Sequence, residues 1–167
     1  HLETAFAETH DASSQPVRSP AMSGASEPAS GAVTTAISLE TVKTIVDTQL
    51  SLPEGFTVHP RLLPQLQRRA KMIDDGTIDW ALGELLAFGS VLLEGHPVRL
   101  AGQDSRRGTF GQRHSVLVDR TTGAEHTPLK TLPGAATFYV YDSLLSEFAA
   151  MGFEYGYSTA RPDALVM

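Results

Sequence analysis

The sequence predicts an α/β fold with a mostly parallel sheet. Apolar segments of strand character lie at residues 98–101, 115–119 and 137–142, and residues 163–167 open a fourth. They alternate with segments of helical spacing that are apolar on several sides. This alternation is typical of a parallel sheet that is covered on both faces. The length of 167 residues suits one domain, and a hydrophobic content of 41% allows it a core.

The first 35 residues are expected to stand apart from this domain. Residues 1–12 read as the frayed end of a helix. Residues 13–35 are rich in Ser, Pro, Ala, Gly and Thr and cannot bury enough surface to offset chain entropy, so we expect a flexible, disordered linker. The chain starts at His1 and stops just after the opening of an apolar segment, so we expect a piece of a larger polypeptide.

Helices are expected between the linker and the first strand. Ser38 can cap a helix whose apolar stripe ends before Pro53. A second helix is predicted from Leu63 to Ile73, with a proline confined to its first turn. A third, from Asp79 to Glu94, is apolar nearly all round, which predicts burial on several sides.

A last helix is predicted over residues 143–160, after the third strand. Ser143, Ser146 and Glu147 stand at its start, where serine caps and acidic side chains stabilise a helix N-terminus. Ligands of parallel sheets sit at the carboxyl ends of strands. We therefore expect the start of this helix, and the polar loop after the first strand, to face a ligand crevice or a partner surface.

That polar loop, GQDSRRGTFGQRHSV at residues 102–116, concentrates basic side chains. Arg106, Arg107 and Arg113 can bind phosphate or carboxylate, or they can hold surface ion pairs with Asp104 and Asp119. The spacing alone favours ion pairs. Its glycines do not form a phosphate-binding fingerprint, because no strand–glycine loop–helix order follows them.

Composition argues against several functions. The net charge of −6 disfavours binding to nucleic acid or to an anionic membrane. There is no cysteine, no apolar run of transmembrane length and no recognisable signal peptide. The six histidines are scattered, so no metal site is predicted. His114, beside an arginine, is expected to make a structural hydrogen bond rather than to act in catalysis.

Glu147 has two interpretations from the residues alone. It is a first-turn helix carboxylate, or it is a carboxylate held in an apolar wall made by Leu144, Leu145 and Phe148. Physical reasoning favours the first. Glu154, seven residues further along roughly the same helix face, competes for any functional role.

Three stretches of the chain resemble the thiamine-dependent first component of the 2-oxoglutarate dehydrogenase complex. They are TIDWALGELLAFGSVLLEGHPVRLAGQDSRRGTFGQRHSV, TGAEHTPL and VYDSLLSEFAAMGFEYGYSTARPDALV. LPEGFTVHPR further resembles the bacterial multifunctional 2-oxoglutarate decarboxylase branch. The resemblance implies the first half of a transketolase-like pyrimidine-binding domain at residues 36–167. Residues 1–12 would be the helix tail of a preceding diphosphate-binding domain.

The resemblance also implies an activity. The family uses thiamine diphosphate and Mg²⁺, with metal ligands outside this chain, to decarboxylate 2-oxoglutarate in the tricarboxylic acid cycle. It passes the succinyl unit to a lipoyl group. The implied partners are a second copy in a homodimer, the lipoyl-bearing succinyltransferase and dihydrolipoyl dehydrogenase, in the bacterial cytoplasm. Alternatives are the same chemistry on 2-oxoadipate, and a non-catalytic subunit-contact module.

Site residues follow from the same resemblance. Glu147 corresponds to the glutamate that contacts N1′ of the cofactor's aminopyrimidine, and Leu145 to a leucine that packs against the cofactor. Gln103 corresponds to a glutamine that lines the active site. For the arginines of the loop and for His114 the resemblance implies no individual roles.

Overall fold

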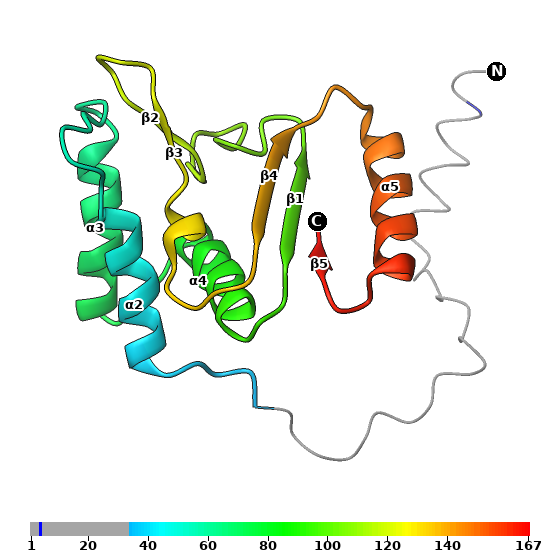
Figure 1. Ribbon diagram of the computed structural model, residues 1–167, viewed down its shortest axis with the longest axis horizontal. Coiled ribbons are helices and arrows are strands. Elements are labelled where there is room, and N and C mark those ends of the chain that lie inside the picture. Colours follow the sequence, from blue (N-terminus) through cyan, green and yellow to red (C-terminus); the bar gives the residue numbers. More distant parts are fainter. Residues whose placement is uncertain (1–3, 5–33) are drawn as a thin grey trace. The chain divides into compact units, whose positions relative to one another are not determined.

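The computed structural model describes residue 4 and residues 34–167 (Figure 1). Apart from Thr4, Thr34 and Thr35, the predicted helix tail at 1–12 and the linker at 13–35 lie outside the described residues. Residues 36–167 form a compact unit by themselves. The domain that the sequence predicts therefore lies wholly within the described residues.

Helices precede the sheet, as the sequence predicts. They are α2 (Leu39–Leu50), α3 (Leu63–Asp74) and α4 (Trp80–Leu93). Ser38 caps α2 by accepting a hydrogen bond from the N–H of Thr41, and Asp79 caps α4 by accepting one from the N–H of Leu82. Such caps satisfy backbone donors that a helix start leaves free, and they explain why both helices begin where they do.

The central sheet is parallel and has the strand order β4-β1-β5, with β1 (Val98–Gly102) in the middle. β4 (Phe138–Asp142) pairs along the whole of β1, whereas β5 (Leu165–Val166) pairs with its first two residues. Val98 and Leu100 are buried in the same core cluster as the residues of α4. Arg99, between them, points to the opposite face, toward α5 (Glu147–Ala160). The two helices therefore cover opposite faces (Figure 1).

The core lies between α2, α4 and the sheet. Phe88 of α4 meets Phe138 of β4 with ring centroids 6.1 Å apart. Gly89, one residue on, allows α2 to approach α4 closely. A β-carbon built on this glycine would lie 2.7–2.8 Å from side-chain atoms of Ile45, which is fully buried. The close packing of α2 on α4 thus requires a residue without a side chain, glycine, at position 89.

Two predicted elements differ from the structure. The strand expected at residues 115–119 does not join the parallel sheet. Its short core, β2 (Leu117–Val118), pairs antiparallel with β3 (Glu125–His126), and a 3₁₀ helix η1 (Pro128–Thr131) follows. The last helix begins at Glu147 and not at residue 143, because Ser146 rather than Ser143 is the cap.

Asp119 causes the first of these differences. Its carboxylate accepts hydrogen bonds from the backbone N–H groups of Thr57 at 2.6 Å, Thr121 at 2.7 Å and Thr122 at 2.8 Å. These bonds bend the chain directly after β2 into the β2–β3 hairpin and tie that hairpin to the loop before α3. They also lower the pKa of Asp119 from 3.8 to about 2.

No helix among the described residues is long and apolar enough to cross a membrane.

Gly89→Ala is expected to lower the free energy of unfolding by about 1–3 kcal/mol, because the new methyl group forces Ile45 out of its place. Gly83→Ala, in the same helix but facing open space, is the matched control. It should leave stability unchanged or raise it by up to about 1 kcal/mol through helix propensity. Urea unfolding followed by circular dichroism measures both. Equal effects of the two changes would contradict the packing argument.

Asp119 should make stability depend on pH in the acid range. Since its folded-state pKa is lowered, its contribution is complete above pH 3.8 and is lost as the pH falls toward about 2. Asp119→Asn is expected to be less stable than wild type at pH 7, with the two unfolding midpoints converging near pH 2. Thermal unfolding from pH 2 to 7 measures this. Asp75→Asn changes an exposed carboxyl after α3 and is the control. Its unfolding midpoint should stay close to that of wild type over the whole pH range.

Candidate cofactor site at the carboxyl ends of β1 and β4

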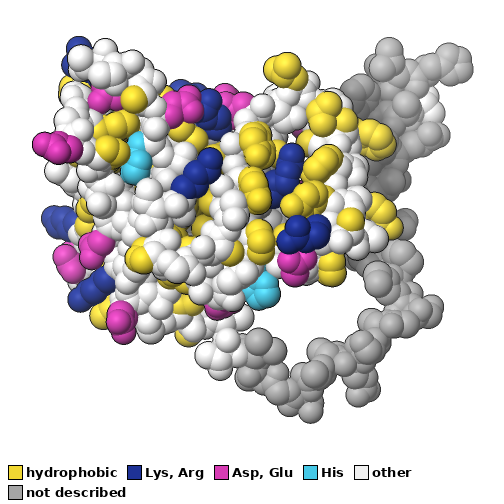
Figure 2. All heavy atoms as spheres, in the orientation of Figure 1, with side chains coloured by type: hydrophobic (Ala, Val, Ile, Leu, Met, Phe, Trp, Pro, Cys, Tyr) yellow, Lys and Arg dark blue, Asp and Glu magenta, His cyan; other side chains and the backbone are white. Residues whose placement is uncertain are grey.

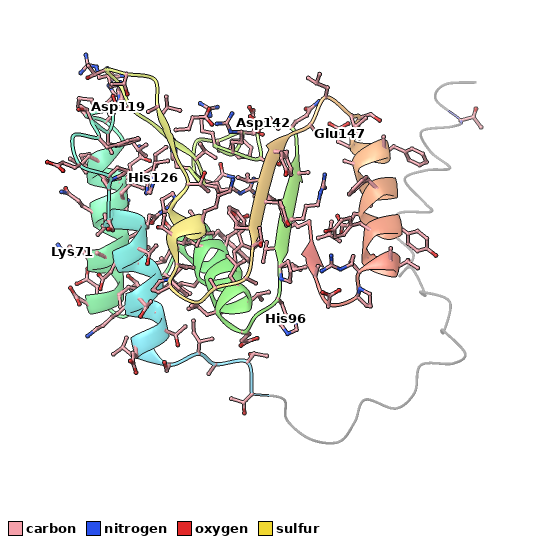
Figure 3. The ribbon with its side chains drawn as sticks, viewed as in Figure 1. Lys71, His96, Asp119, His126, Asp142 and Glu147 are labelled. Atoms are coloured by element: carbon pink, nitrogen blue, oxygen red, sulfur yellow. The ribbon has the colours of Figure 1, made fainter. Side chains whose placement is uncertain are left out.

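The register of β1 and β4 brings two polar segments together. Val98 lies opposite Phe138, and Gly102 lies opposite Asp142, so both strands end at the same level. The N–H of Ser143, after β4, donates to the carbonyl of Gly102 at 2.9 Å. The polar loop and the segment leading into α5 therefore leave the sheet side by side. Figure 3 shows Asp142 and Glu147 at this edge.

A small pocket of about 210 Å³ opens between these two segments. Gln103 lines it from the polar loop, and Leu145 and Glu147 line it from the start of α5. The remaining lining residues are Ala101, Gly102, Ala150, Met151 and Glu154. The structure thus brings the predicted site residues Gln103, Leu145 and Glu147 into one pocket, although 41 residues of chain separate the first two.

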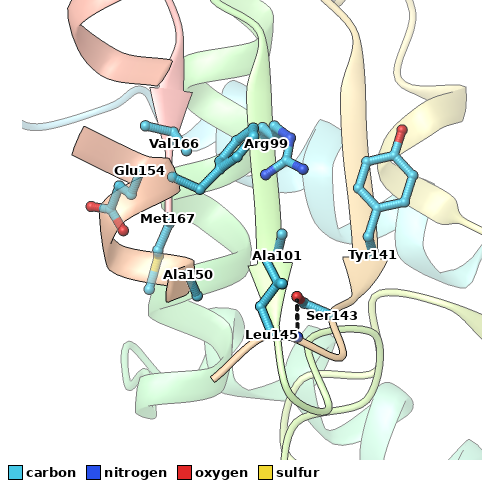
Figure 4. Close-up of a pocket in the computed structure, with 10 residues that line it drawn as sticks. Arg99, Ala101, Tyr141, Ser143, Leu145, Ala150, Glu154, Val166 and Met167 are labelled. Carbon is cyan, nitrogen blue, oxygen red and sulfur yellow. Dashed lines mark hydrogen bonds between the residues drawn. The ribbon is translucent and has the colours of Figure 1, made fainter. Parts of the chain in front are cut away.

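Local hydrogen bonds position the α5 side of this pocket. The hydroxyl of Ser143 accepts from the N–H of Leu145 at 3.1 Å, which folds the segment before the helix (Figure 4). The hydroxyl of Ser146 accepts from the N–H of Ala149 and caps α5. Glu147 then occupies the first turn, where the helix dipole favours a negative charge. Glu147 is therefore both a carboxylate in the first turn of the helix and a carboxylate that lines the pocket.

The apolar wall of the second interpretation of Glu147 is not formed by the described residues. Leu144 is fully exposed, Phe148 is 89% exposed, and Leu145 is half exposed. Leu144 lies in the open segment before the helix, and Phe148 lies on a side of α5 that no described residue covers. Glu154 lines the same pocket as Glu147, so the geometry does not choose between the two carboxylates.

The arginines of the polar loop hold the loop in place. Arg113 donates through two nitrogens to both carboxylate oxygens of Glu84 on α4, at 2.6 and 2.8 Å, and through a third to the carbonyl of Ser105. Arg69 of α3, which is buried, donates to the carbonyls of Gln112 and Arg113. These contacts fasten the loop to α4, which covers one face of the sheet, and to α3.

The second anchor of the loop is Arg106. Its side chain forms an ion pair with Glu125 of β3, and its N–H donates to the carboxylate of Asp142 at 2.9 Å. The prediction of ion pairs is therefore confirmed for Arg106 and Arg113, but the predicted partners, Asp104 and Asp119, are wrong. The side chain of Arg107 stays exposed, and among residues 34–167 it donates only to the carbonyl of Thr109 within the loop.

His114 supports the structural interpretation. It has a positive φ of 50° and is half-buried within the loop. Burial and, to a smaller degree, the neighbouring charges of Arg69 and Arg107 lower its pKa below 6.5. It does not line the pocket.

Sequence reasoning missed the acidic partners of these arginines. Glu84 interrupts an otherwise apolar helix, and Asp142 ends an apolar strand, so each carries a signal. A lone carboxylate in an apolar segment indicates a partner. No pattern in the sequence says which arginine that partner is.

Among residues 34–167, no group of acidic or histidine side chains could hold a metal ion.

Comparison with known proteins assigns the class. Residues 76–167 match the family model described as transketolase, pyrimidine binding domain. The match covers more than half of the chain, and the chain belongs to this family. The predicted fold, a pyrimidine-binding domain with a parallel sheet, is confirmed.

The chain is also similar to particular proteins. It is 55% identical over 140 residues to the multifunctional 2-oxoglutarate metabolism enzyme of Mycobacterium sp. (strain JLS). It is 51% identical over 142 residues to the protein of the same name from Mycolicibacterium vanbaalenii. These alignments cover 80% and 81% of the chain but 11% of each relative. The predicted resemblance is confirmed, and the chain spans about a ninth of the length of the relatives.

Arg113→Met is expected to lower the free energy of unfolding by about 1–3 kcal/mol, because it leaves the half-buried carboxylate of Glu84 without its charged donor. Arg107→Met, at the exposed arginine of the same loop, should change it by less than about 0.5 kcal/mol. Urea unfolding measures both. If Arg113→Met is as mild as Arg107→Met, the ion pair does not hold the loop.

Proposed function

We propose that the chain is the pyrimidine-binding part of a thiamine diphosphate-dependent enzyme that decarboxylates 2-oxoglutarate and passes the succinyl unit to a lipoyl group. The observation that carries the proposal is the pocket in which Gln103, Leu145 and Glu147 meet. Two findings support it: the family is described as pyrimidine-binding, and the similar mycobacterial proteins are named for 2-oxoglutarate metabolism.

The pocket has the chemistry that a flat, nitrogen-containing ring requires. Ala101, Leu145 and Met151 offer apolar contacts to the faces of a ring. The amide of Gln103 and the carboxyl of Glu147 offer hydrogen-bonding groups at its edge. An aminopyrimidine presents both kinds of surface, so these side chains fit the cofactor's ring.

Glu147 would perform the acid–base step. When bound, thiamine diphosphate supplies a carbon nucleophile that attacks the 2-oxo carbon and accepts the electrons released with carbon dioxide. The Glu147 carboxyl would hold a proton at N1′ of the pyrimidine, which favours the imino form of the ring's amino group. Proton transfer by a positioned carboxyl contributes roughly 100- to 10,000-fold in rate.

Leu145 and Gln103 would orient the ring. Leu145 is fixed by the Ser143 hydroxyl, so it can hold an apolar ring face at a constant distance from Glu147. Gln103 follows β1 directly, and its backbone is fastened by the neighbouring loop contacts of Arg106 and Arg113. A ring set between them presents N1′ to the carboxyl in one geometry.

The rest of the machinery would come from outside residues 34–167. That segment has no cluster of metal ligands, so Mg²⁺ and the diphosphate would be held elsewhere. We further propose a homodimer that works with a lipoyl-bearing succinyltransferase and dihydrolipoyl dehydrogenase in the bacterial cytoplasm. The same chemistry on 2-oxoadipate is the alternative substrate. A non-catalytic subunit-contact module is the alternative role.

Glu147→Gln is expected to keep the fold but to lower the rate of decarboxylation by at least about 100-fold, because the amide cannot exchange a proton with N1′. Glu154→Gln, which changes a second carboxyl of the same pocket, is the matched control and should have a much smaller effect. Single-turnover decarboxylation of 2-oxoglutarate by the whole protein, at saturating cofactor and Mg²⁺, measures both.

Each other outcome rejects a part of the proposal. A crippled Glu154→Gln with a near-wild-type Glu147→Gln would move the role to Glu154. Faster turnover of 2-oxoadipate than of 2-oxoglutarate by the wild type would change the substrate. A wild-type protein that decarboxylates neither acid would favour the subunit-contact module.

A further inference from the structure

Arg99 is a charged residue within the central strand, β1. Its neighbours Val98 and Leu100 are buried against α4, while its own side chain is half-buried on the opposite face of the sheet, beneath α5. A charge removed from water at such a place requires compensation from its surroundings. The proposed function gives this arginine no role.

Aromatic rings provide that compensation. The guanidinium carbon of Arg99 lies 4.1 Å from the ring centroid of Phe153, 5.5 Å from that of Tyr141 and 5.7 Å from that of Tyr157. The rings of Phe153 and Tyr157, one turn apart on α5, stack at 5.6 Å. Among residues 34–167, no carboxylate lies within ion-pair distance of Arg99 and no acceptor takes a hydrogen bond from its side chain. Stacking on rings is therefore its main contact.

This cluster is one of the contacts that attach α5 to the sheet, together with the contacts of α5 with β5. No residue of α5 is buried, although Ala149, Ala150 and Tyr157 are half-buried. Its larger apolar side chains are mostly exposed, and Figure 2 shows hydrophobic side chains at the surface in this part of the molecule. A helix without a buried apolar stripe has little hydrophobic stabilisation. The contact of Arg99 with Phe153 and Tyr157 is thus expected to matter for its attachment.

The cluster adjoins the proposed cofactor pocket. A second hollow, of about 200 Å³, is lined by Arg99, Tyr141 and Phe153 and shares Leu145, Ala150 and Glu154 with that pocket (Figure 4). In Figure 4 the guanidinium points toward Tyr141, while the carboxylate of Glu154 points away on the far side of the hollow. The stack on rings, and not a pair with Glu154, sets the position of Arg99.

We propose that Arg99 is a positioning residue: its guanidinium binds α5 to the sheet through Phe153, Tyr157 and Tyr141, and thereby fixes the place of Glu147 in the pocket. Arginine suits this role because its planar, weakly hydrated cation stacks on rings while its stem packs on the strand. Lysine provides the charge without the plane, and methionine provides the stem without the charge.

Amide hydrogen exchange tests the attachment directly, in the whole protein. Arg99→Met is expected to speed exchange of α5 amides by about tenfold, the change expected when a half-buried cation loses its cation–π contacts, and to leave α2 and α4 unchanged. Arg99→Lys should give a smaller increase. The control is Arg68→Met, which makes the same change at an exposed arginine of α3 and should alter neither. Unchanged exchange in α5, or equal acceleration in all helices, would overturn the proposal.

The effect on Glu147 rests on the proposed function and is measured separately. At saturating cofactor, Arg99→Met should slow single-turnover decarboxylation by about tenfold, with partial rescue in Arg99→Lys. Glu147→Gln is measured alongside. If Glu147→Gln is impaired and Arg99→Met is not, the positioning role is wrong and the proposed function stands. If Glu147→Gln is unimpaired, the proposed function fails, and hydrogen exchange alone decides whether Arg99 holds α5.

Discussion

The parallel register of β1 on β4 is the constraint on which the site depends. It sets Gly102 opposite Asp142, so the chain leaves both strands at one level and the residues after them become neighbours. A slip of one residue would exchange the two faces of a strand. Leu100 would then leave the core and the charge of Arg99 would enter it against α4, which is prohibitively costly. The hydrophobic alternation of β1 thereby also fixes the geometry of the pocket.

The two walls of the pocket are held by different interactions. The loop wall, with Gln103, is fastened by charged hydrogen bonds from Arg113 to Glu84 and by the contacts of Arg106 with Glu125 and Asp142. These bonds are directional, and the Arg113–Glu84 pair is partly shielded from water, so they allow few alternative arrangements. The helix wall, with Glu147, rests on α5, which has no buried residue. Differences in the position of Glu147 relative to Gln103 would therefore arise from movements of α5 rather than of the loop.

The sequence predicts those features that local chemistry decides. Ser38 and Asp79 cap the helices that follow them, and the alternation of segments predicts the parallel sheet. The sequence does not predict features that depend on a partner residue far away along the chain. The segment 115–119 has strand character, but the three backbone bonds of Asp119, one of them to Thr57 of a loop 62 residues earlier, turn it into a hairpin. Arg113 likewise pairs with Glu84, 29 residues away on α4, and not with Asp104 of its own loop. The family resemblance implies the grouping of Gln103, Leu145 and Glu147, whereas their spacing in the sequence does not predict it.

The exposed side of α5 bears on the chemistry proposed for Glu147. Phe148, Met151 and Tyr155 have the spacing of a buried helix stripe, yet each is at least 70% exposed. A hydrogen bond between a carboxyl and a ring nitrogen is strong only where water is excluded. Residues 34–167 do not exclude it at this side of Glu147, since Phe148 beside it is open to solvent. Catalysis by this carboxyl, as proposed, thus requires a second surface over the stripe, and a second copy of the protein in the proposed homodimer would provide one. Arg99 anchors the opposite side of the helix, so α5 could keep its place on the sheet while its outer side is covered.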